Sequence, residues 1–167
     1  MMAVKAMLNN IEALNATPLN ACNLLVDFVS THALSGRSEN DRNEKISFNF
    51  IRHLKSIGPN GMKALCNVLN KGKRTKNGRL RYSGCVAHKN PLFSLEAVKG
   101  MNLFYRFNLM GEKFPDFLDP KDFLLRPMIR SETNHAQSIG CRTQNNMYHI
   151  LHKHIGFKGV LVSTTLL

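Results

Sequence analysis

The chain of 167 residues is 43% hydrophobic and carries 23 Lys or Arg against 11 Asp or Glu, which gives a formal charge of +12. This length accommodates one domain with its own core, and the hydrophobic fraction excludes a disordered basic tail. The positive charge favours a polyanionic partner, although charge alone does not identify a fold.

Helical spacing of apolar residues dominates the beginning of the chain. Residues 3–14 place apolar side chains three and four positions apart, and Thr17-Pro18 then offers an N-cap with proline at the first helical position. A second helix is predicted from there to about residue 29, and the polar residues 32–45 predict a loop that can include a helical turn. Residues 46–54 alternate like a strand but also fit helical spacing, so both interpretations stay open.

A strand and a basic hairpin are predicted in the middle of the chain. Residues 62–69 are short and apolar enough for a buried strand, which leads into residues 71–89 with seven Lys or Arg and no acidic residue. Asn77-Gly78 favours a two-residue turn because both turn positions need a positive φ, and residues 79–86 alternate as the second arm. The phosphates of a nucleic acid would attract such a finger, whereas the plain alternative is a solvated basic loop.

The C-terminal half predicts two helices. Residues 94–109 are apolar all round, as is typical of a helix at the centre of a core, and Gly111 suits the position after its end. An acidic, proline-containing loop over 115–123 and a second loop over 133–141 precede a last helix over 143–155. The expected fold class is therefore mainly α with one small β-hairpin. The apolar final residues predict that the polypeptide continues beyond the given sequence.

Cysteine spacing and the N-terminal segment exclude several classes of protein. The four cysteines form no CxxC pair, which excludes a zinc ribbon or a thioredoxin-type site, and we expect no metal and no other cofactor. Residues 1–16 lack the apolar continuity of a signal peptide, and no apolar run approaches the roughly 18 residues of a membrane span. We expect a reduced, intracellular setting without a membrane partner.

Three groups of side chains suggest a specific chemistry, but a plainer interpretation suits each better. Solvated or phosphate-facing histidines are a better interpretation than a metal site for the set Cys141, His149, His152 and His154. Loop capping is a better interpretation than calcium binding for Asp116, Asp119 and Asp122, because prolines interrupt them. Core packing is a better interpretation than base stacking for the cluster Phe104, Tyr105 and Phe107.

A dense set of local motifs follows the basic segment. In chain order they are Gly72-Lys73-Arg74, Gly78, Ala87-His88-Lys89-Asn90-Pro91, Phe104-Tyr105-Arg106-Phe107, Gly111-Glu112, Phe114-Pro115-Asp116-Phe117 and, later, Thr143-Gln144. Their order resembles domain II of the large DNA-binding subunit of the yeast centromere-binding complex, the Ndc-ten-like family. By this resemblance residues 31–167 form the domain, incomplete at its C-terminus, and residues 1–30 form an N-terminal helical segment. The chain departs from the family pattern at Arg74-Thr75, Ala87 and Ser94.

The resemblance implies both a fold and a role. Domains of this family are related in fold to tyrosine recombinases and to the recombinases of fungal mobile elements. A helical domain like an integrase catalytic core is therefore expected. The family binds DNA without cutting it, which implies a nuclear protein of the centromere or kinetochore. The implied partners are double-stranded DNA and other subunits of a centromere-binding complex, and a dimer of the full-length protein is compatible with this role.

The recombinase reaction needs a tyrosine nucleophile with two Arg and a Lys or His around the scissile phosphate. By resemblance, Lys73 or Lys76 would supply the hairpin lysine and Arg42 the first arginine. The chain contains no HxxR motif, and Tyr148 precedes the point at which that motif should lie. We therefore expect no enzymatic activity.

Phosphate contacts with weak base specificity are expected from the basic segment and its flanks. The expected DNA-binding residues are Lys71, Lys73, Arg74, Lys76, Arg79, Arg81, His88, Lys89 and Arg42. Two alternatives stay open. One is a fragment of a mobile-element recombinase that lacks its HxxR box and its nucleophile. The other is a helical scaffold for protein interactions, in which the basic charge is incidental.

Overall fold

The computed structural model of the chain describes residues 17–34, 38–55, 57, 61–69 and 80–155. Within these residues there are five α-helices, three strands, two 3-10 turns and one π-helical turn. In chain order they are α2 (Pro18–Leu34), α3 (Ser38–Asn43), η1 (Ile46–Phe48), β1 (Asn49–Leu54), β2 (Met62–Leu69), β3 (Arg81–Val86), η2 (Pro91–Phe93), α4 (Leu95–Phe104), η3 (Tyr105–Leu109), α5 (Pro120–Leu125) and α6 (Cys141–Ile155). The helix predicted over residues 3–14 lies outside the described residues.

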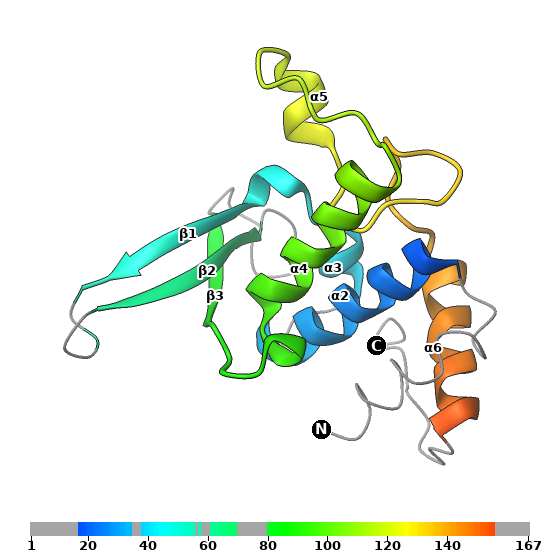
Figure 1. Ribbon diagram of the computed structural model, residues 1–167, viewed down its shortest axis with the longest axis horizontal. Helices are drawn as coiled ribbons and strands as arrows, with labels where there is room; N and C mark the ends of the chain where they lie inside the picture. The colour runs from blue at the N-terminus through cyan, green and yellow to red at the C-terminus, as the bar shows by residue number, and fades with distance from the viewer. Residues whose placement is uncertain (1–16, 35–37, 56, 58–60, 70–79, 156–167) are drawn as a thin grey trace.

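The three strands form one antiparallel sheet in the order β1-β2-β3. Pairing runs from Asn49 opposite Asn67 to Leu54 opposite Met62, and from Ala64 opposite Val86 to Leu69 opposite Arg81. Helices α2 and α4 lie beside one end of the sheet, while the β1–β2 end extends away from the helices (Figure 1). The fold is thus mixed, with a sheet beside the helices.

The predicted buried strand over residues 62–69 is confirmed as β2, and the predicted second arm is confirmed from Arg81 onward. The segment 46–54, which stayed open between strand and helix, forms a 3-10 turn followed by β1. The sheet is therefore larger than the expected hairpin, because β1 adds a third strand that pairs with residues Met62 to Asn67 of β2. The expected fold class, mainly α, is correct only in the loose sense that helices predominate among the described residues.

The core lies between α2, α4, the inner side of the sheet and the segment before α6. Its fully or nearly buried apolar residues are Leu24, Leu25, Val26, Val29, Leu65, Leu95, Val98, Met128, Ile129, Ile139 and Met147. Helix α2 starts as predicted, with the Thr17 hydroxyl accepting from the Asn20 amide at 3.4 Å. It runs to Leu34, beyond the predicted end near residue 29, which is a correction, whereas the short helix α3 lies within the predicted loop, where a helical turn was allowed.

Helix α4 buries a polar face, contrary to the expectation of an apolar helix at the centre of the core. Leu95 and Val98 are buried as expected, but Lys99, Asn102 and Arg106 are buried with them. The outward-facing residues include Phe104, whose side chain is 57% exposed. The prediction that the aromatic cluster around Phe104 belongs to the core is therefore wrong for Phe104 itself.

Each buried polar side chain of α4 meets a partner from a distant part of the chain. Lys99 pairs with the Glu44 carboxylate and donates to the Asn49 side-chain oxygen at 2.8 Å. Asn102 donates to the Asn23 side-chain oxygen on α2 at 3.3 Å. Leaving a buried charge without a partner costs roughly several kcal/mol of folding free energy. These pairs therefore fix the position of α4 relative to α2 and to the start of β1.

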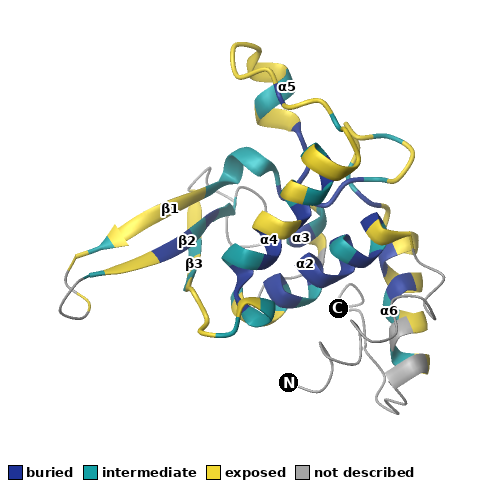
Figure 2. Ribbon diagram, in the orientation of Figure 1, coloured by how far each residue is buried: buried dark blue, intermediate teal, exposed yellow. Residues whose placement is uncertain are grey.

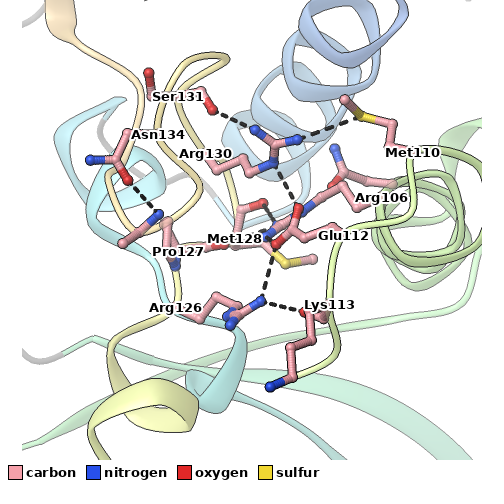
Figure 3. A network of polar contacts seen from close by, with 12 residues as sticks. Arg106, Met110, Glu112, Lys113, Arg126, Pro127, Met128, Arg130, Ser131 and Asn134 are labelled. Carbon is pink, nitrogen blue, oxygen red and sulfur yellow. Dashed lines mark hydrogen bonds and ion pairs between the residues drawn. The ribbon is translucent and has the colours of Figure 1, made fainter. Parts of the chain in front are cut away.

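The fully buried Arg106 anchors a second network around one carboxylate, that of Glu112. Arg106 donates to Glu112 from Nε at 3.0 Å and from Nη2 at 2.7 Å, a two-pronged pair. Its remaining nitrogen, Nη1, donates to the backbone carbonyls of Pro127 and Met128, both at 3.0 Å. The helix is thereby fastened to the chain that follows α5 (Figure 3).

Two further guanidinium groups complete this network. Arg126 donates to Glu112 at 3.3 Å and to the Lys113 carbonyl at 2.6 Å, and Nε of Arg130 lies 2.8 Å from the Glu112 carboxylate. Burial tends to raise the pKa of Glu112, but the hydrogen bonds and charge of Arg106, with the charges of Arg130 and Arg126, lower it overall. Glu112 therefore stays ionised within the network.

Helix α4 ends in a π turn, which brings Glu112 back to Arg106. The Met110 amide donates to the Tyr105 carbonyl at 2.9 Å, five residues back, and the Glu112 amide donates to the Arg106 carbonyl at 3.0 Å. Gly111 has a φ of +68°, as predicted for the residue after a helix end. The wider turn also rotates Leu109 outward, where 66% of it is exposed.

The segment predicted as an acidic loop contains the short helix α5. Asp119 accepts from the Lys121 amide at 2.9 Å and caps this helix, and Asp116 accepts from the Leu118 amide at 2.8 Å. Asp122 accepts from the Asp116 amide and pairs with Arg126. Loop capping is thus confirmed for these aspartates. In the described part of the chain, no three His, Cys, Asp or Glu side chains are grouped closely enough for a metal.

Replacing Glu112 with glutamine is expected to destabilise the fold by about 3 kcal/mol, because three buried guanidinium groups lose their shared counter-charge. Urea denaturation followed by circular dichroism measures this change. Glu132→Gln is the matched control, because Glu132 is exposed and should change stability by less than about 0.5 kcal/mol. Equal stability of the two variants would contradict the structural role of the network.

Candidate nucleic-acid interface

Charge is segregated along this chain, and the sheet belongs to the segment without acidic residues. Between Glu44 and Glu96 the sequence contains no Asp or Glu, but it contains eleven Lys or Arg. These are Lys45, Arg52, Lys55, Lys63, Lys71, Lys73, Arg74, Lys76, Arg79, Arg81 and Lys89. All three strands fall within this interval. The sheet is therefore a cationic surface without internal neutralisation by carboxylates of its own strands.

The described basic residues of the sheet are exposed and occupy both of its faces. Arg52 and His53 are successive residues of β1, so their side chains leave on opposite faces. Lys55 follows β1, Lys63 lies opposite His53 on β2, and Arg81 opens β3. All five are exposed. The β1–β2 end of the sheet extends clear of the helices, and most of β1 is exposed (Figure 2).

Five of the predicted DNA-binding residues lie outside the described residues, namely Lys71, Lys73, Arg74, Lys76 and Arg79. Three others lie at the two ends of β3: Arg81 begins the strand, while His88 and Lys89 follow its opposite end, and all three are exposed. The predicted Asn77-Gly78 turn also falls outside the described residues.

His88 has a structural role in addition to its predicted one. Its Nδ1 accepts from the Asn90 amide at 3.0 Å, and its ring lies edge-on to Phe93 with centroids 5.6 Å apart. Nδ1 accepts this hydrogen bond in the tautomer that carries its proton on Nε2, which is then a donor. His88 thus orders the turn into η2 and keeps one donor for a ligand.

Among the predicted DNA-binding residues that the structure describes, Arg42 is the one that lies away from the sheet, on α3. It is half-buried on α3, and its guanidinium donates to the Gln144 side-chain oxygen on α6. Gln144 in turn donates to Asp27 on α2 at 2.6 Å. Arg42 therefore links three helices, a contact that the family resemblance did not predict.

Two carboxyl groups and a tyrosine lie close to this link. Burial, reinforced by the nearby charge of Asp27, raises the pKa of Asp41 to about 7, while the Thr31 hydroxyl donates to it at 3.0 Å. Burial also raises the pKa of Asp27, although hydrogen bonds from Gln144 and Tyr148 oppose the shift. Burial and the charge of Asp27 likewise raise the pKa of Tyr148. Burial thus disfavours the charged form of each of these three groups.

The sequence reasoning missed the exposed basic residues of β1 and β2, together with two aromatic side chains on the sheet. Phe50 on β1 and Tyr82 on β3 are both exposed, with ring centroids 6.1 Å apart and an interplanar angle of 84°. The absence of acidic residues from 45 to 95 was a signal that could have identified the whole sheet as the charged surface. The contact between Phe50 and Tyr82 could not be predicted from the sequence in the same way, because it depends on the order of the strands in the sheet.

Comparisons with known proteins found no match among family models, curated proteins or solved structures. No helix in the described part of the chain is both long and apolar enough to cross a membrane.

Replacing Asp41 with asparagine should make stability less dependent on pH. The folded-state pKa near 7 exceeds the unfolded value near 3.8, so the carboxyl favours the fold at acid pH and this contribution is lost as pH rises from about 4 to 7. Asparagine cannot ionise. The free energy of unfolding of the variant, relative to that of the unchanged protein, should therefore increase by about 2 kcal/mol between roughly pH 5 and pH 8.

Denaturant titrations across this pH range measure the effect. Glu39→Gln, an exposed change on the same helix, is the control and should leave the pH profile as in the unchanged protein. A parallel pH profile for Asp41→Asn and the unchanged protein would contradict the raised pKa.

Proposed function

We propose that this protein binds duplex DNA without catalysis, through the cationic surface of its three-stranded sheet. The single observation that carries this proposal is the exposed basic sheet within a 51-residue interval free of Asp and Glu. The resemblance to centromere-binding proteins supports the same role and adds a nuclear setting with other subunits of such a complex as partners.

The physical reason is counterion release. A duplex carries one negative charge per roughly 1.7 Å of its axis, and each Lys or Arg that neutralises a phosphate releases a condensed cation. Arg52, Lys63 and Arg81 lie on different strands, and the register places Arg52 on one face of the sheet and Lys63 and Arg81 on the other, so both faces carry positive charge. Phosphate contacts of this kind set position and affinity and carry little information about base sequence.

The surroundings of Tyr148 and Arg42 support a binding role over a recombinase reaction. The Tyr148 hydroxyl is partly buried beside Asp27, and its pKa is raised, whereas a nucleophile must lose its proton readily. The Arg42 guanidinium is already hydrogen-bonded to Gln144. Neither group is presented on the surface that would meet DNA under this proposal.

Salt-dependent binding tests the phosphate contacts. Arg52→Gln, Lys63→Gln and Arg81→Gln are each expected to reduce the slope of log K against log salt by about 0.9, since each removes one phosphate contact. Fluorescence anisotropy with a labelled blunt duplex, repeated over a series of salt concentrations, measures these slopes.

Lys121→Gln is the matched control, because Lys121 is exposed on α5, away from the sheet. It should leave the slope unchanged. The proposal fails if the three sheet variants keep the full slope, or if Lys121→Gln lowers it as much as they do.

A second candidate function, a scaffold for protein interactions, is favoured by the segment around α5. This α5 arm, residues 113–125, projects from the body (Figure 1) and exposes several large apolar side chains. They are Phe114, Phe117, Leu118, Leu124 and Leu125, of which Leu118 is 92% exposed. Exposed apolar clusters on soluble proteins commonly mark protein contacts.

If the α5 arm binds another protein chain, Leu118→Ser should weaken self-association without changing DNA affinity. Sedimentation velocity over a range of protein concentrations measures the first quantity and anisotropy the second. A monomer at every concentration, in both the unchanged protein and the variant, would remove self-association as the role of the arm.

A further inference from the structure

The outer face of the sheet, turned away from the core, combines exposed aromatic and apolar side chains with a cation. Leu65 of β2 belongs to the core and Cys85 of β3 packs against it, so their face is the inner one. Side chains alternate along each strand, and the register therefore assigns the other face. The exposed and half-buried side chains of the outer face include Phe50, Arg52, Cys66, Val68, Tyr82 and Val86.

Phe50 and Tyr82 come from the two edge strands, yet their rings meet across β2. The centroids lie 6.1 Å apart, with the rings nearly perpendicular. Phe50 stands opposite Cys66, which stands opposite Gly84, so no side chain of β3 occupies that row. A Cβ on Gly84 would lie 3.3 Å from the Cys66 sulfur, which shows how closely the two strands pack there.

The pair stays open to solvent despite this contact. Tyr82 is 64% exposed and Phe50 is 40% exposed, although each could bury a large apolar area. Arg52 lies two residues after Phe50 on the same face and is also exposed. Aromatic rings beside a cation, on a surface without acidic residues, are complementary to a base with its attached phosphate.

We infer that Phe50 and Tyr82 form a stacking site for unpaired bases of a nucleic-acid strand that adjoins the bound duplex, with Arg52 contacting its phosphates. This inference rests on the proposed DNA binding and specifies the substrate: duplex DNA with an unpaired segment. Bases inside a duplex are stacked on one another, so only unpaired ones can offer a free face to the rings.

Charge argues against the other occupants of such a face. A second copy of this chain would bring the same cationic sheet, and like charges would meet. An apolar protein segment would cover the rings but would leave the Arg52 guanidinium without a partner. A nucleic-acid strand satisfies the rings and the cation at once.

The test compares a blunt duplex with the same duplex carrying a short unpaired tail that contains a fluorescent purine analogue. The tail should tighten binding about tenfold, equivalent to about 1.4 kcal/mol, through stacking. Binding should also quench the analogue, which responds to stacking. The combined variant Phe50→Leu with Tyr82→Leu should lose both effects and keep the affinity for the blunt duplex.

Phe117→Leu is the control, because it removes an exposed ring from the α5 arm and should keep both effects. Circular dichroism checks that the variants fold, as is expected for substitutions at exposed positions. For the blunt duplex, the slope of log K against log salt should be the same for the combined variant and the unchanged protein, because stacking neutralises no phosphate.

The outcomes separate this inference from the proposed function. If the blunt duplex binds but the tail adds nothing, or its gain survives the combined variant, the inference is overturned and duplex binding stands. The unchanged protein could instead bind only the tailed duplex and the free single strand, and the combined variant could bind neither. In that case the stacking site is supported and the proposed duplex binding is overturned. If the unchanged protein binds none of these DNAs, both the inference and the proposed function are overturned. A dimer of the free protein that Tyr82→Leu dissociates would assign the face to a second copy, against the inference.

Discussion

The Glu112 carboxylate is the contact on which the arrangement of this molecule depends. Three guanidinium groups converge on it, from the π turn after α4 and from the chain after α5. That same chain reaches the rest of the core: the Arg130 carbonyl accepts from Asn23 of α2 at 2.9 Å, and the Met128 amide donates to the Glu44 carbonyl at 2.9 Å. Since Glu44 also pairs with Lys99, one continuous set of buried polar contacts connects the helices to the beginning of the sheet.

This arrangement uses acidic residues inside the molecule and leaves the sheet cationic. Asp27, Asp41 and Glu44 are buried among the helices, and Glu112 lies within its ring of arginines. None of the carboxylates lies on β1, β2 or β3. The body therefore balances its own charges, while the projecting sheet does not. A surface whose charge is unbalanced in this way is suited to a ligand that brings many charges of the opposite sign.

Local patterns predicted α2, β2 and β3, because each shows the apolar period of its own element. The same reasoning failed for the inner face of α4, since the partners that permit Lys99 and Arg106 to be buried lie elsewhere in the chain. Helical spacing also extended the predicted helix to residue 109 without interruption, because no periodic pattern reveals the π turn that rotates Leu109 outward. Phe50 and Tyr82 are 32 positions apart in sequence, and only the pairing of both strands with β2 brings them together.

The π turn has a consequence for how this gene can vary. Residues Tyr105–Leu109 contain one residue more than an ordinary helical turn would hold. Loss of that extra residue would turn the following chain by about 100° around the helix axis and shift it by about 1.5 Å. The Glu112 carboxylate would then point away from its three arginines. An in-frame deletion of a single codon here is therefore more harmful than exchange of the exposed Leu109 side chain, and the number of residues matters more than their identity.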